Sequence, residues 1–559
     1  MSGLTFFALN GENIDPLQNM QAAVESTNKL THRGANAVRF QKIDKGVYMG
    51  CCTIGSVTGC FCTIGDIAVV CNANIYNYKH LKHKYRLPGC RDTHCSELIL
   101  YLFLKLKSLR LFVNELEGAF SFVIYDKKKK AVHAARDMLG LRPLFWTGNT
   151  NYPIGFASEA KGLMFHSDLR VSACEQFPPG HTLSFCCKGG TGHQPTLCRP
   201  FKLRDEVLGV NAVFKAQHHP GQAKPTPTSF IYSGLRNLLQ SAVRKRIGDD
   251  GARVCCLLSG GLNSSLVTAL VVREMVSRGS VASDVGTYTI GIQGSNDLKM
   301  ARTVAELLGT RHQEVVLTRR NFLKAISQVI WQIESYDVET VRASVGTFLL
   351  SKYISKTSQD QIVFTGDIAD ALFASHLGFS RAPNTRALQE ENVKMVLNLH
   401  WFDSLRVDRC IGGAGLEARV PFADLAFVKY TMSLLPDLKQ LDRRPNGRME
   451  KHLLRAAFMG EGLLPASILW RRKVACSDSI SASGRPWYTI VQEHAKSQRD
   501  RLSGVCRLGE QRGADWTDEQ WWYKFLFSRH FGRRFQGIPK RWIQPFGTAA
   551  DDPSARRLQ

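Results

Sequence analysis

The first third of the chain alternates short apolar runs with polar turns, which is the pattern of β-strands. Two longer segments, 16–29 and 96–107, repeat their apolar residues at helical spacing. Strands flanked by helices predict an α+β layered domain over residues 1–187. The strand-like runs span residues 5–9, 67–71, 120–125, 131–135, 153–157 and 181–186.

Beyond residue 229 the pattern changes, and apolar runs are separated by longer amphipathic segments. A mostly helical pattern follows from about residue 390 to 530. Strands that alternate with helices predict an α/β doubly wound parallel sheet, whose ligands bind beyond the carboxyl ends of the strands. We therefore expect a second domain over residues 229–545 with a helical C-terminal part. Its strand-like runs span residues 254–258, 287–292, 313–317 and 362–365.

Two segments lack either pattern. Residues 188–228 are rich in Gly, Pro and polar residues, so we predict a linker or a surface excursion there. Residues 546–559 are polar and are expected to be a tail.

Composition places the chain among globular proteins. It has 559 residues, of which 44% are hydrophobic and 22% charged. We find neither an apolar run long enough to span a bilayer nor a basic start followed by a signal-like apolar stretch. We therefore expect a cytoplasmic protein without a membrane partner. In that compartment the 16 cysteines are predicted to be reduced thiols that pack in the core.

The formal net charge of +25 favours anionic partners, including nucleotides and, nonspecifically, polyanions such as nucleic acids. The basic residues are nevertheless scattered. Their densest run, residues 127–130, follows a predicted strand and is expected to be a solvated hairpin turn.

The segment that follows the apolar run 254–258 carries the clearest chemistry. It reads Ser259-Gly260-Gly261, then Leu-Asn, then Ser264-Ser265 at the start of a helical pattern. Glycines let the backbone approach a phosphate, and the amides of the turn and helix start then point at it. No Gly-Lys-Ser/Thr follows, so the segment is not a Walker loop. The sequence therefore predicts a phosphate cradle.

This cradle resembles the pyrophosphate loop of ATP-pyrophosphatase enzymes, and the chain as a whole resembles glutamine-dependent asparagine synthetases of the animal type. In that family an N-terminal nucleophile hydrolase-like domain releases ammonia from glutamine. The ammonia passes to an ATP-pyrophosphatase-like domain, where ATP adenylates the aspartate side chain and ammonia displaces AMP. The matching segments are 32–34, 75–77, 136–137, 140–145, 158–163, 334–337, 416–422, 450–455 and 468–471.

The resemblance places the glutaminase nucleophile at Ser2, where the family has a cysteine. The family's oxyanion-hole pair, Asn-Gly, falls at Asn72 and Ala73, and the glutamate after it falls at Asn74. The aspartate that meets the glutamine amino group falls at Cys95, and residues 46–78 contain no arginine to clamp the glutamine carboxylate. An alcohol is a far weaker nucleophile than a thiol, and both charged contacts are missing. The sequence therefore predicts that glutaminase activity is lost.

In the second domain the resemblance implies an ATP site with weakened Mg²⁺ binding. Asn263 replaces the loop aspartate that helps to hold Mg²⁺, which leaves Asp370 and a neutral oxygen of Asn263 as metal ligands. Asp367 replaces the glutamate that is important for forming the intermediate, and Ile368 and Ala371 replace a glycine and a glutamate. The expected ATP-binding residues are Leu258, Ser259, Gly260, Gly261, Asn263, Ser264, Ser265, Ile290, Thr365, Gly366, Asp370 and Lys451.

Several functions remain open from the sequence. The first is a catalytically degenerate family member that binds ATP and aspartate, and that acts through a partner, either an active synthetase subunit or a second copy of itself. The second is an active ligase that uses free ammonia. Adenylation of another acid and a basic nucleic-acid-associated protein are further alternatives.

Overall fold

The computed structural model describes most of the chain, and it divides into two compact units. Residues 1–204 make up the main part of the first unit, and residues 205–411 and 418–533 the main part of the second. The described residues are 2–9, 16–34, 36–53, 59–87, 89–91, 94–147, 154–164, 174–186, 196–200, 228–248, 251–441, 448–473, 481, 486–502, 516–532, 541–542 and 545–546.

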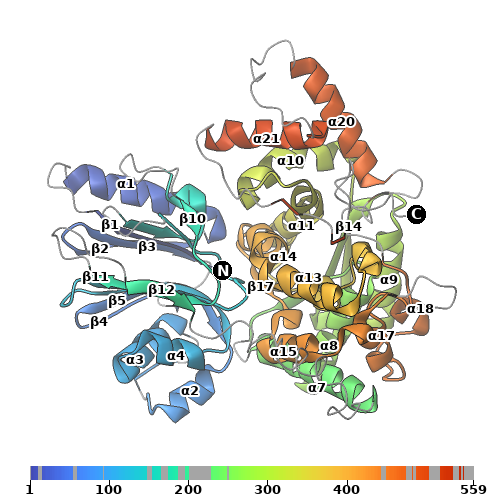
Figure 1. Ribbon diagram of the computed structural model, residues 1–559, viewed down its shortest axis with the longest axis horizontal. Helices are drawn as coiled ribbons and strands as arrows, with labels where there is room; N and C mark the ends of the chain where they lie inside the picture. The colour runs from blue at the N-terminus through green and yellow to red at the C-terminus, as the bar shows by residue number, and fades with distance from the viewer. Residues whose placement is uncertain are drawn as a thin grey trace. The chain divides into compact units, whose positions relative to one another are not determined.

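The described strands of the first unit form two sheets (Figure 1). The first has the order β10-β8-β9-β1-β3-β2 and the second β12-β11-β7-β6-β5-β4. The strand bounds are β1 Gly3–Ala8, β2 Ala37–Asp44, β3 Val47–Thr53, β4 Phe61–Ile64, β5 Ile67–Ile75, β6 Gly118–Asp126, β7 Ala131–Arg136, β8 Phe145–Trp146, β9 Ile154–Ala157, β10 Glu175–Gln176, β11 His181–Cys186 and β12 Thr196–Pro200.

The two sheets face each other, and helices cover their outer faces (Figure 1). Because side chains alternate along a strand, β5 sends Val70 into the core between the sheets and Val69 towards the helices. Val123 and Phe122 of β6 alternate in the same way. The result is the predicted α+β layered domain. Its described helices are α1 Pro16–Asn28 on one face, and α2 Tyr78–Lys84, α3 Cys95–Leu106 and α4 Leu109–Glu115 on the other.

The second unit contains a sheet of order β15-β14-β13-β16-β17. β13 pairs in parallel with both β14 and β16. The chain therefore runs outwards from β13 to β15 and then returns to the other side of β13, so the strand order reverses between β13 and β16. Such a switch point opens a crevice at the carboxyl ends of the strands. The bounds are β13 Val254–Leu257, β14 Gly286–Ile292, β15 Arg311–Leu317, β16 Ile362–Phe364 and β17 Glu417–Arg419.

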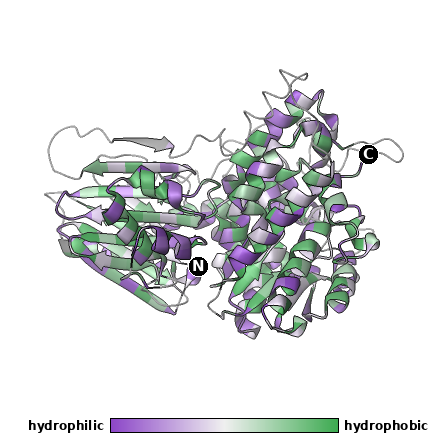
Figure 2. Cartoon of the chain, turned by 90° about the horizontal axis from the view of Figure 1, so that it is seen from below, coloured by the Kyte–Doolittle hydropathy of each residue, from purple (hydrophilic) through white to green (hydrophobic). Residues whose placement is uncertain are grey.

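Helices connect these strands and form the C-terminal part, as predicted. Most show hydrophilic and hydrophobic residues interleaved along their length, as expected for helices that cover a core with one face (Figure 2). None of the described helices is long and apolar enough to cross a bilayer. The bounds are α7 Thr228–Ile247, α8 Leu262–Ser277, α9 Asn296–Leu308, α10 Arg319–Ile333, α11 Val338–Thr357, α12 Ala369–Leu372, α13 Thr385–Leu397, α14 Asp403–Val407, α15 Leu425–Ser433, α16 Pro436–Lys439, α17 His452–Phe458, α18 Ala466–Leu469, α20 Trp487–Leu502 and α21 Asp518–Phe531.

The span predicted to be a linker, 188–228, contains a strand. β12 lies within it and pairs antiparallel with β11. The first unit therefore continues past residue 187, to a boundary at Arg204. Residues 188–195 and 201–227 of the predicted linker lie outside the described residues, as do residues 547–559 of the predicted tail.

Candidate functional site

The predicted phosphate cradle is a turn between β13 and α8. The hydroxyl of Ser264 accepts from the Ser259 amide at 3.2 Å, and the two hydroxyl oxygens lie 3.0 Å apart. The Gly261 amide donates to the Ser259 hydroxyl at 3.3 Å, so these side chains fold the turn onto itself. The Ser265 hydroxyl is fully buried and has no hydrogen-bond partner among the described residues.

Gly260 has a conformation that the cradle needs. Its φ of +67° lies in the left-handed region that favours glycine. A Cβ there would lie 2.5 Å from the backbone carbonyl carbon of Met300 in α9. The turn can therefore pack closely on α9 only because residue 260 has no side chain.

A second loop, which follows β16, approaches the cradle from the neighbouring strand. A Cβ on Gly366 would lie 2.6 Å from the backbone carbonyl carbon of Asn263, so the two backbones are in close contact. Next to it, the Thr365 hydroxyl donates to Asp367 Oδ2 at 2.5 Å, and the Asp367 amide donates back to Thr365 Oγ1 at 3.1 Å. The switch point of the sheet therefore joins the two predicted motifs.

Ile368 lies at a glycine-favouring position in this second loop. Its φ is +77°, immediately before the short helix α12. A β-branched residue is rare in this region of backbone space, and such conformations cost about 1–3 kcal/mol. The resemblance placed a glycine at position 368. The isoleucine found there therefore has a strained backbone conformation.

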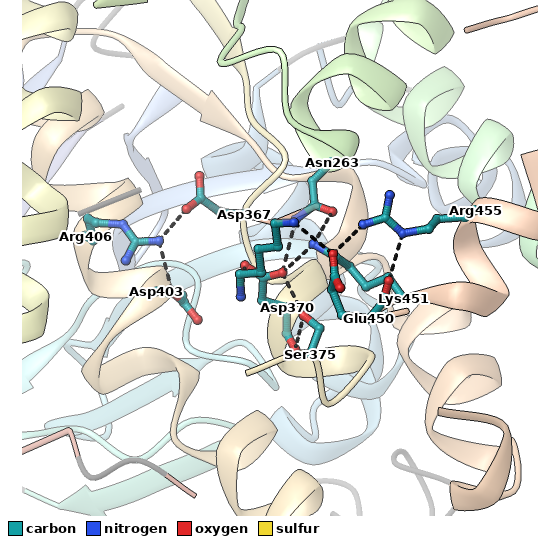
Figure 3. Close-up of polar contacts among 10 residues, drawn as sticks. Asn263, Asp367, Asp370, Ser375, Asp403, Arg406, Glu450, Lys451 and Arg455 are labelled. Atoms are coloured by element: carbon teal, nitrogen blue, oxygen red, sulfur yellow. Dashed lines mark hydrogen bonds and ion pairs between the residues drawn. The ribbon is translucent and has the colours of Figure 1, made fainter. Parts of the chain in front are cut away.

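Asp370 is the centre of a polar cluster (Figure 3). Lys451 Nζ donates to Asp370 Oδ1 at 2.7 Å and to Asn263 Oδ1 at 3.1 Å. Lys473 Nζ lies 3.0 Å from the other carboxylate oxygen, Oδ2. The Ser375 hydroxyl also donates to Oδ1, at 2.8 Å. Two ammonium groups against one carboxylate leave this cluster with an excess of one positive charge.

The pKa values follow from this arrangement. Burial raises the pKa of Asp370, but the charges of Lys451 and Lys473 outweigh it and hold the pKa well below its ordinary value. Burial lowers the pKa of Lys451, and Asp370 partly offsets that effect. Burial and the charge of Lys473 lower the pKa of the adjacent His376 to about 3, so its imidazole is neutral near pH 7. The site therefore presents an ionised Asp370 and a neutral His376 at physiological pH.

Asp367 is held by a different partner. Arg406 NH2 lies 2.5 Å from Asp367 Oδ1 and 2.9 Å from Asp403 Oδ1, and so bridges the two carboxylates (Figure 3). Burial raises the pKa of Asp403. The carboxylate at the position expected to act on the intermediate is thus already paired with a guanidinium group.

These residues do not form a ready-made divalent cation site. Among the described residues, no group of three or more His, Cys, Asp or Glu side chains is placed to hold a metal ion. Of the two predicted ligands, Asn263 has no charge, and Asp370 has both oxygens engaged by lysines. Mg²⁺ prefers carboxylate and phosphate oxygens, and Asp370 is the one carboxylate of the two predicted ligands.

The remaining predicted ATP contacts lie at the ends of buried strands. Leu258 follows β13 and is 1% exposed, and Ile290 in β14 is 8% exposed. The sequence prediction did not place Ser375 or Arg406 in the site, and it noted Lys473 only as a residue that matches a family segment. Arg471 was not placed there either, although it contacts both the Ser259 carbonyl oxygen (3.4 Å) and Asp297 (2.9 Å). Only the Trp-Arg-x-Lys segment, residues 470–473, offered a signal for Arg471 and Lys473.

The first unit brings Ser2 and Asn72 together. The Ser2 amide donates to Asn72 Oδ1 at 3.3 Å, and the Ser2 hydroxyl donates to Thr53 Oγ1 at 3.4 Å. Arg33 Nε donates to the Ser2 carbonyl oxygen at 3.2 Å. Asn72 Nδ2 is buried without a hydrogen-bond partner among the described residues, so one donor of the oxyanion-hole type remains.

The other predicted glutamine-site residues carry no charge for recognition. Ala73 and Asn74 follow Asn72 in β5, and Cys95 is the first residue of α3. Arg142 donates to Asn74 Oδ1. The positions expected to bind the ammonium and carboxylate groups of glutamine are therefore neutral.

Together, the layered first unit and the switch-point cradle of the second define a class: a glutamine amidotransferase-type domain joined to an ATP-pyrophosphatase-type domain. Comparisons agree with this class. The family model for a glutamine amidotransferase domain matches residues 8–178, and the model for asparagine synthase matches residues 234–401 and 380–533.

Curated relatives narrow the class to a family. The chain is 35% identical over 554 residues to a glutamine-hydrolysing asparagine synthetase of Bos taurus, with 95% of both chains covered. It is 34% identical over 556 residues to the Homo sapiens protein of the same name, again with 95% of both covered. The Gallus gallus protein is 34% identical over 558 residues, covering 96% of this chain and 95% of the relative. The chain belongs to the asparagine synthetase family.

Proposed function

We propose that this chain is a catalytically degenerate asparagine synthetase that binds ATP but has lost glutaminase activity and has impaired or absent synthetase activity. It acts as a nucleotide-binding or partner-binding pseudoenzyme. The observation that carries this proposal is the charge of the ATP site. Asp370 is enclosed by Lys451 and Lys473, and the residue beside it, Asn263, is neutral.

Such a site suits a polyphosphate better than a metal. Backbone amides of a turn and helix start attract phosphate groups, and the two lysines add charge-assisted donors. An aspartate at position 263 would instead supply a second carboxylate next to Asp370. The asparagine keeps the shape of that side chain, accepts from Lys451 and removes its charge.

The first unit supports the same proposal from an independent site. Glutamine has to be held by its ammonium and carboxylate groups, and each charge-assisted contact contributes about 1.5–3 kcal/mol. Cys95 and Asn74 can supply no such contact to the ammonium group. The domain is then retained as a folded scaffold rather than as a source of ammonia.

Calorimetric titration of ATP, once with Mg²⁺ and once with EDTA, tests the proposal. We expect weak binding whose dissociation constant changes by less than about tenfold, or about 1.4 kcal/mol, when the metal is removed. Asn263→Asp should make binding clearly metal-dependent, and Asn263→Ala is the matched control that adds no charge. Wild-type binding that disappears in EDTA would contradict the proposal.

One alternative is supported by a specific observation. Asp367, Asp370 and Lys451 all lie at the switch point beside the cradle, as an active ligase would need. An ammonia-dependent asparagine synthetase is therefore the second candidate. Asparagine formation from aspartate, ATP and ammonia, but not from glutamine, would distinguish it from the pseudoenzyme.

The partners in this proposal are ATP, aspartate and a second synthetase chain, which is either an active subunit or a copy of this one. The proposed compartment is the cytoplasm. The net charge of +25 adds nonspecific binding of polyanions.

A further inference from the structure

Two thiols meet between the sheets of the first unit. Cys51 lies in β3 of one sheet, and Cys60 lies directly before β4 of the other. Their Sγ atoms are 3.2 Å apart, and both residues belong to the core between the sheets. The Cys60 carbonyl oxygen accepts from the Cys71 amide at 2.8 Å, which ties Cys60 to β5. The contact therefore joins the two sheets.

The two thiols have unequal roles in this contact. The contact with Cys51 lowers the pKa of the Cys60 thiol despite its burial. The same hydrogen bond, together with burial, raises the pKa of Cys51. Thiolates are the reactive form of cysteine, so Cys60 is the thiol of this pair that reacts first.

Neighbouring cysteines are engaged elsewhere. Cys52 Sγ donates to the Leu30 carbonyl oxygen at 2.9 Å, and Cys71 Sγ donates to the Gly59 carbonyl oxygen at 3.6 Å. Burial raises the pKa of both thiols. No metal-binding group of three or more side chains occurs in the described part of the chain, so the contact is not part of a metal site there.

We propose that Cys51 and Cys60 are an oxidisable pair, which hydrogen peroxide converts into a disulfide between the two sheets. In the first step the Cys60 thiolate attacks one peroxide oxygen, which breaks the O–O bond and gives a sulfenic acid and hydroxide. In the second step Cys51 sulfur attacks the Cys60 sulfur. The S–S bond forms, the sulfenic oxygen leaves, and the Cys51 proton and the departing oxygen end as water. Overall, two thiols and one peroxide give one disulfide and two waters.

Oxidation changes how the two sheets are joined. In the disulfide a covalent bond replaces the hydrogen bond between the two thiols, so β3 is covalently tied to the chain that enters β4. A cross-link that closes a loop restricts the unfolded chain. The oxidised first unit is therefore expected to resist unfolding better than the reduced one, and a reductant should reverse the effect.

Peptide mapping of the reduced, full-length protein after a limited dose of hydrogen peroxide tests this proposal. We expect a peptide that links Cys51 to Cys60, the loss of two titratable thiols, and a higher unfolding midpoint that dithiothreitol reverses. Cys51→Ala should abolish the link and leave a sulfenic acid on Cys60, which dimedone traps. Cys52→Ala, its neighbour in β3, is the matched control and should form the link normally.

Two results would overturn the proposal. One is a folded wild-type protein in which Cys51 and Cys60 both remain reduced after exposed thiols such as Cys186 have been oxidised. The other is a Cys60 linked as often to Cys52 or Cys71 as to Cys51. Because the wild-type measurement alone decides between these results and the expected one, the proposal stays testable even if a variant fails to fold.

Discussion

At the residue scale, both candidate sites hold uncharged side chains in defined positions. Asn263 stays in contact with Lys451 and lies beside Asp370, but it contributes no charge. Ser2 stays hydrogen-bonded to Asn72, but it is an alcohol rather than a thiol. Packing and catalysis depend on different atoms. A scaffold can therefore hold such side chains in place whether or not the site is catalytically active.

The first residue-scale prediction concerns Ser2. The purified protein, with its N-terminal methionine removed and checked by mass, should release no glutamate from glutamine. Ser2→Cys should not restore hydrolysis, because residues that bind the charged groups of glutamine are missing as well. A coupled glutamate assay measures this. Steady hydrolysis by the wild type that Ser2→Ala abolishes would show that the first unit is active.

The second residue-scale prediction concerns Lys439, a buried lysine at the end of α16. Its ammonium group contacts Asn392 Oδ1 at 3.2 Å and Met432 Sδ at 3.7 Å. Burial lowers its pKa to about 7. Between about pH 7 and the ordinary lysine pKa, near 10.4, the unfolded chain thus binds more protons than the folded one, and stability should rise with pH by up to about 1.4 kcal/mol per unit.

Lys439→Met should remove this dependence. We expect the variant to unfold at a higher temperature than the wild type near pH 7, and the difference to shrink as the pH approaches about 10. Thermal unfolding across this pH range measures it. Lys429→Met, on the exposed side of α15, is the control and should leave the pH profile unchanged. A difference that grows with pH would contradict the assignment.

At the scale of elements, the site depends on two loops that follow β13 and β16 and meet where the strand order reverses. The first loop needs a left-handed residue at position 260 and the second has one at position 368. The first is a glycine and the second an isoleucine. The cradle is therefore built without strain, while the neighbouring loop is held in a strained conformation by its surroundings.

This difference gives an element-scale prediction. Gly260→Ala should destabilise the second unit by roughly 1–3 kcal/mol and weaken ATP binding, because the new methyl group would meet the α9 backbone in a disfavoured conformation. Gly261→Ala is the matched control. Its φ is −78°, and its Cβ would approach only the Ser259 hydroxyl, at 3.3 Å. Equal effects of the two substitutions on unfolding and binding would contradict the role given to Gly260.

Several strands with strong apolar contrast could be predicted from the sequence, but β3, which is buried along its whole length, was not among the expected strands. The expected strand 181–186 coincides with β11, and the four strands predicted in the second unit start within two residues of β13, β14, β15 and β16. β2 was missed because it is an edge strand whose side chains are half-buried or exposed. β17 was missed because it has only three residues.

The candidate site could likewise be predicted only in part from the sequence. Its loops could be located because their motifs are local in sequence. Lys473, Ser375 and Arg406 come from three separate segments, and only the folded chain brings them to Asp370 and Asp367. The enclosure of Asp370 by two lysines, on which the proposed function rests, therefore could not be inferred from spacing alone.

At the scale of the whole molecule, the protein keeps both domains of its family, and the proposed function concerns one candidate site in each. Family models match each domain, and relatives align over 95% of the chain. The two proposed losses are independent, since one concerns recognition of glutamine and the other the charge around ATP.

The most direct test is ATP/pyrophosphate exchange that depends on aspartate, measured first with ammonia and then with glutamine. The account predicts no aspartate-dependent exchange by the wild type with either nitrogen source. The variant Asn263→Asp/Asp367→Glu/Ile368→Gly should show exchange with ammonia alone, because it restores the carboxylates and relieves the backbone at position 368. Robust aspartate-dependent exchange by the wild type would contradict the account and make this protein an active ligase.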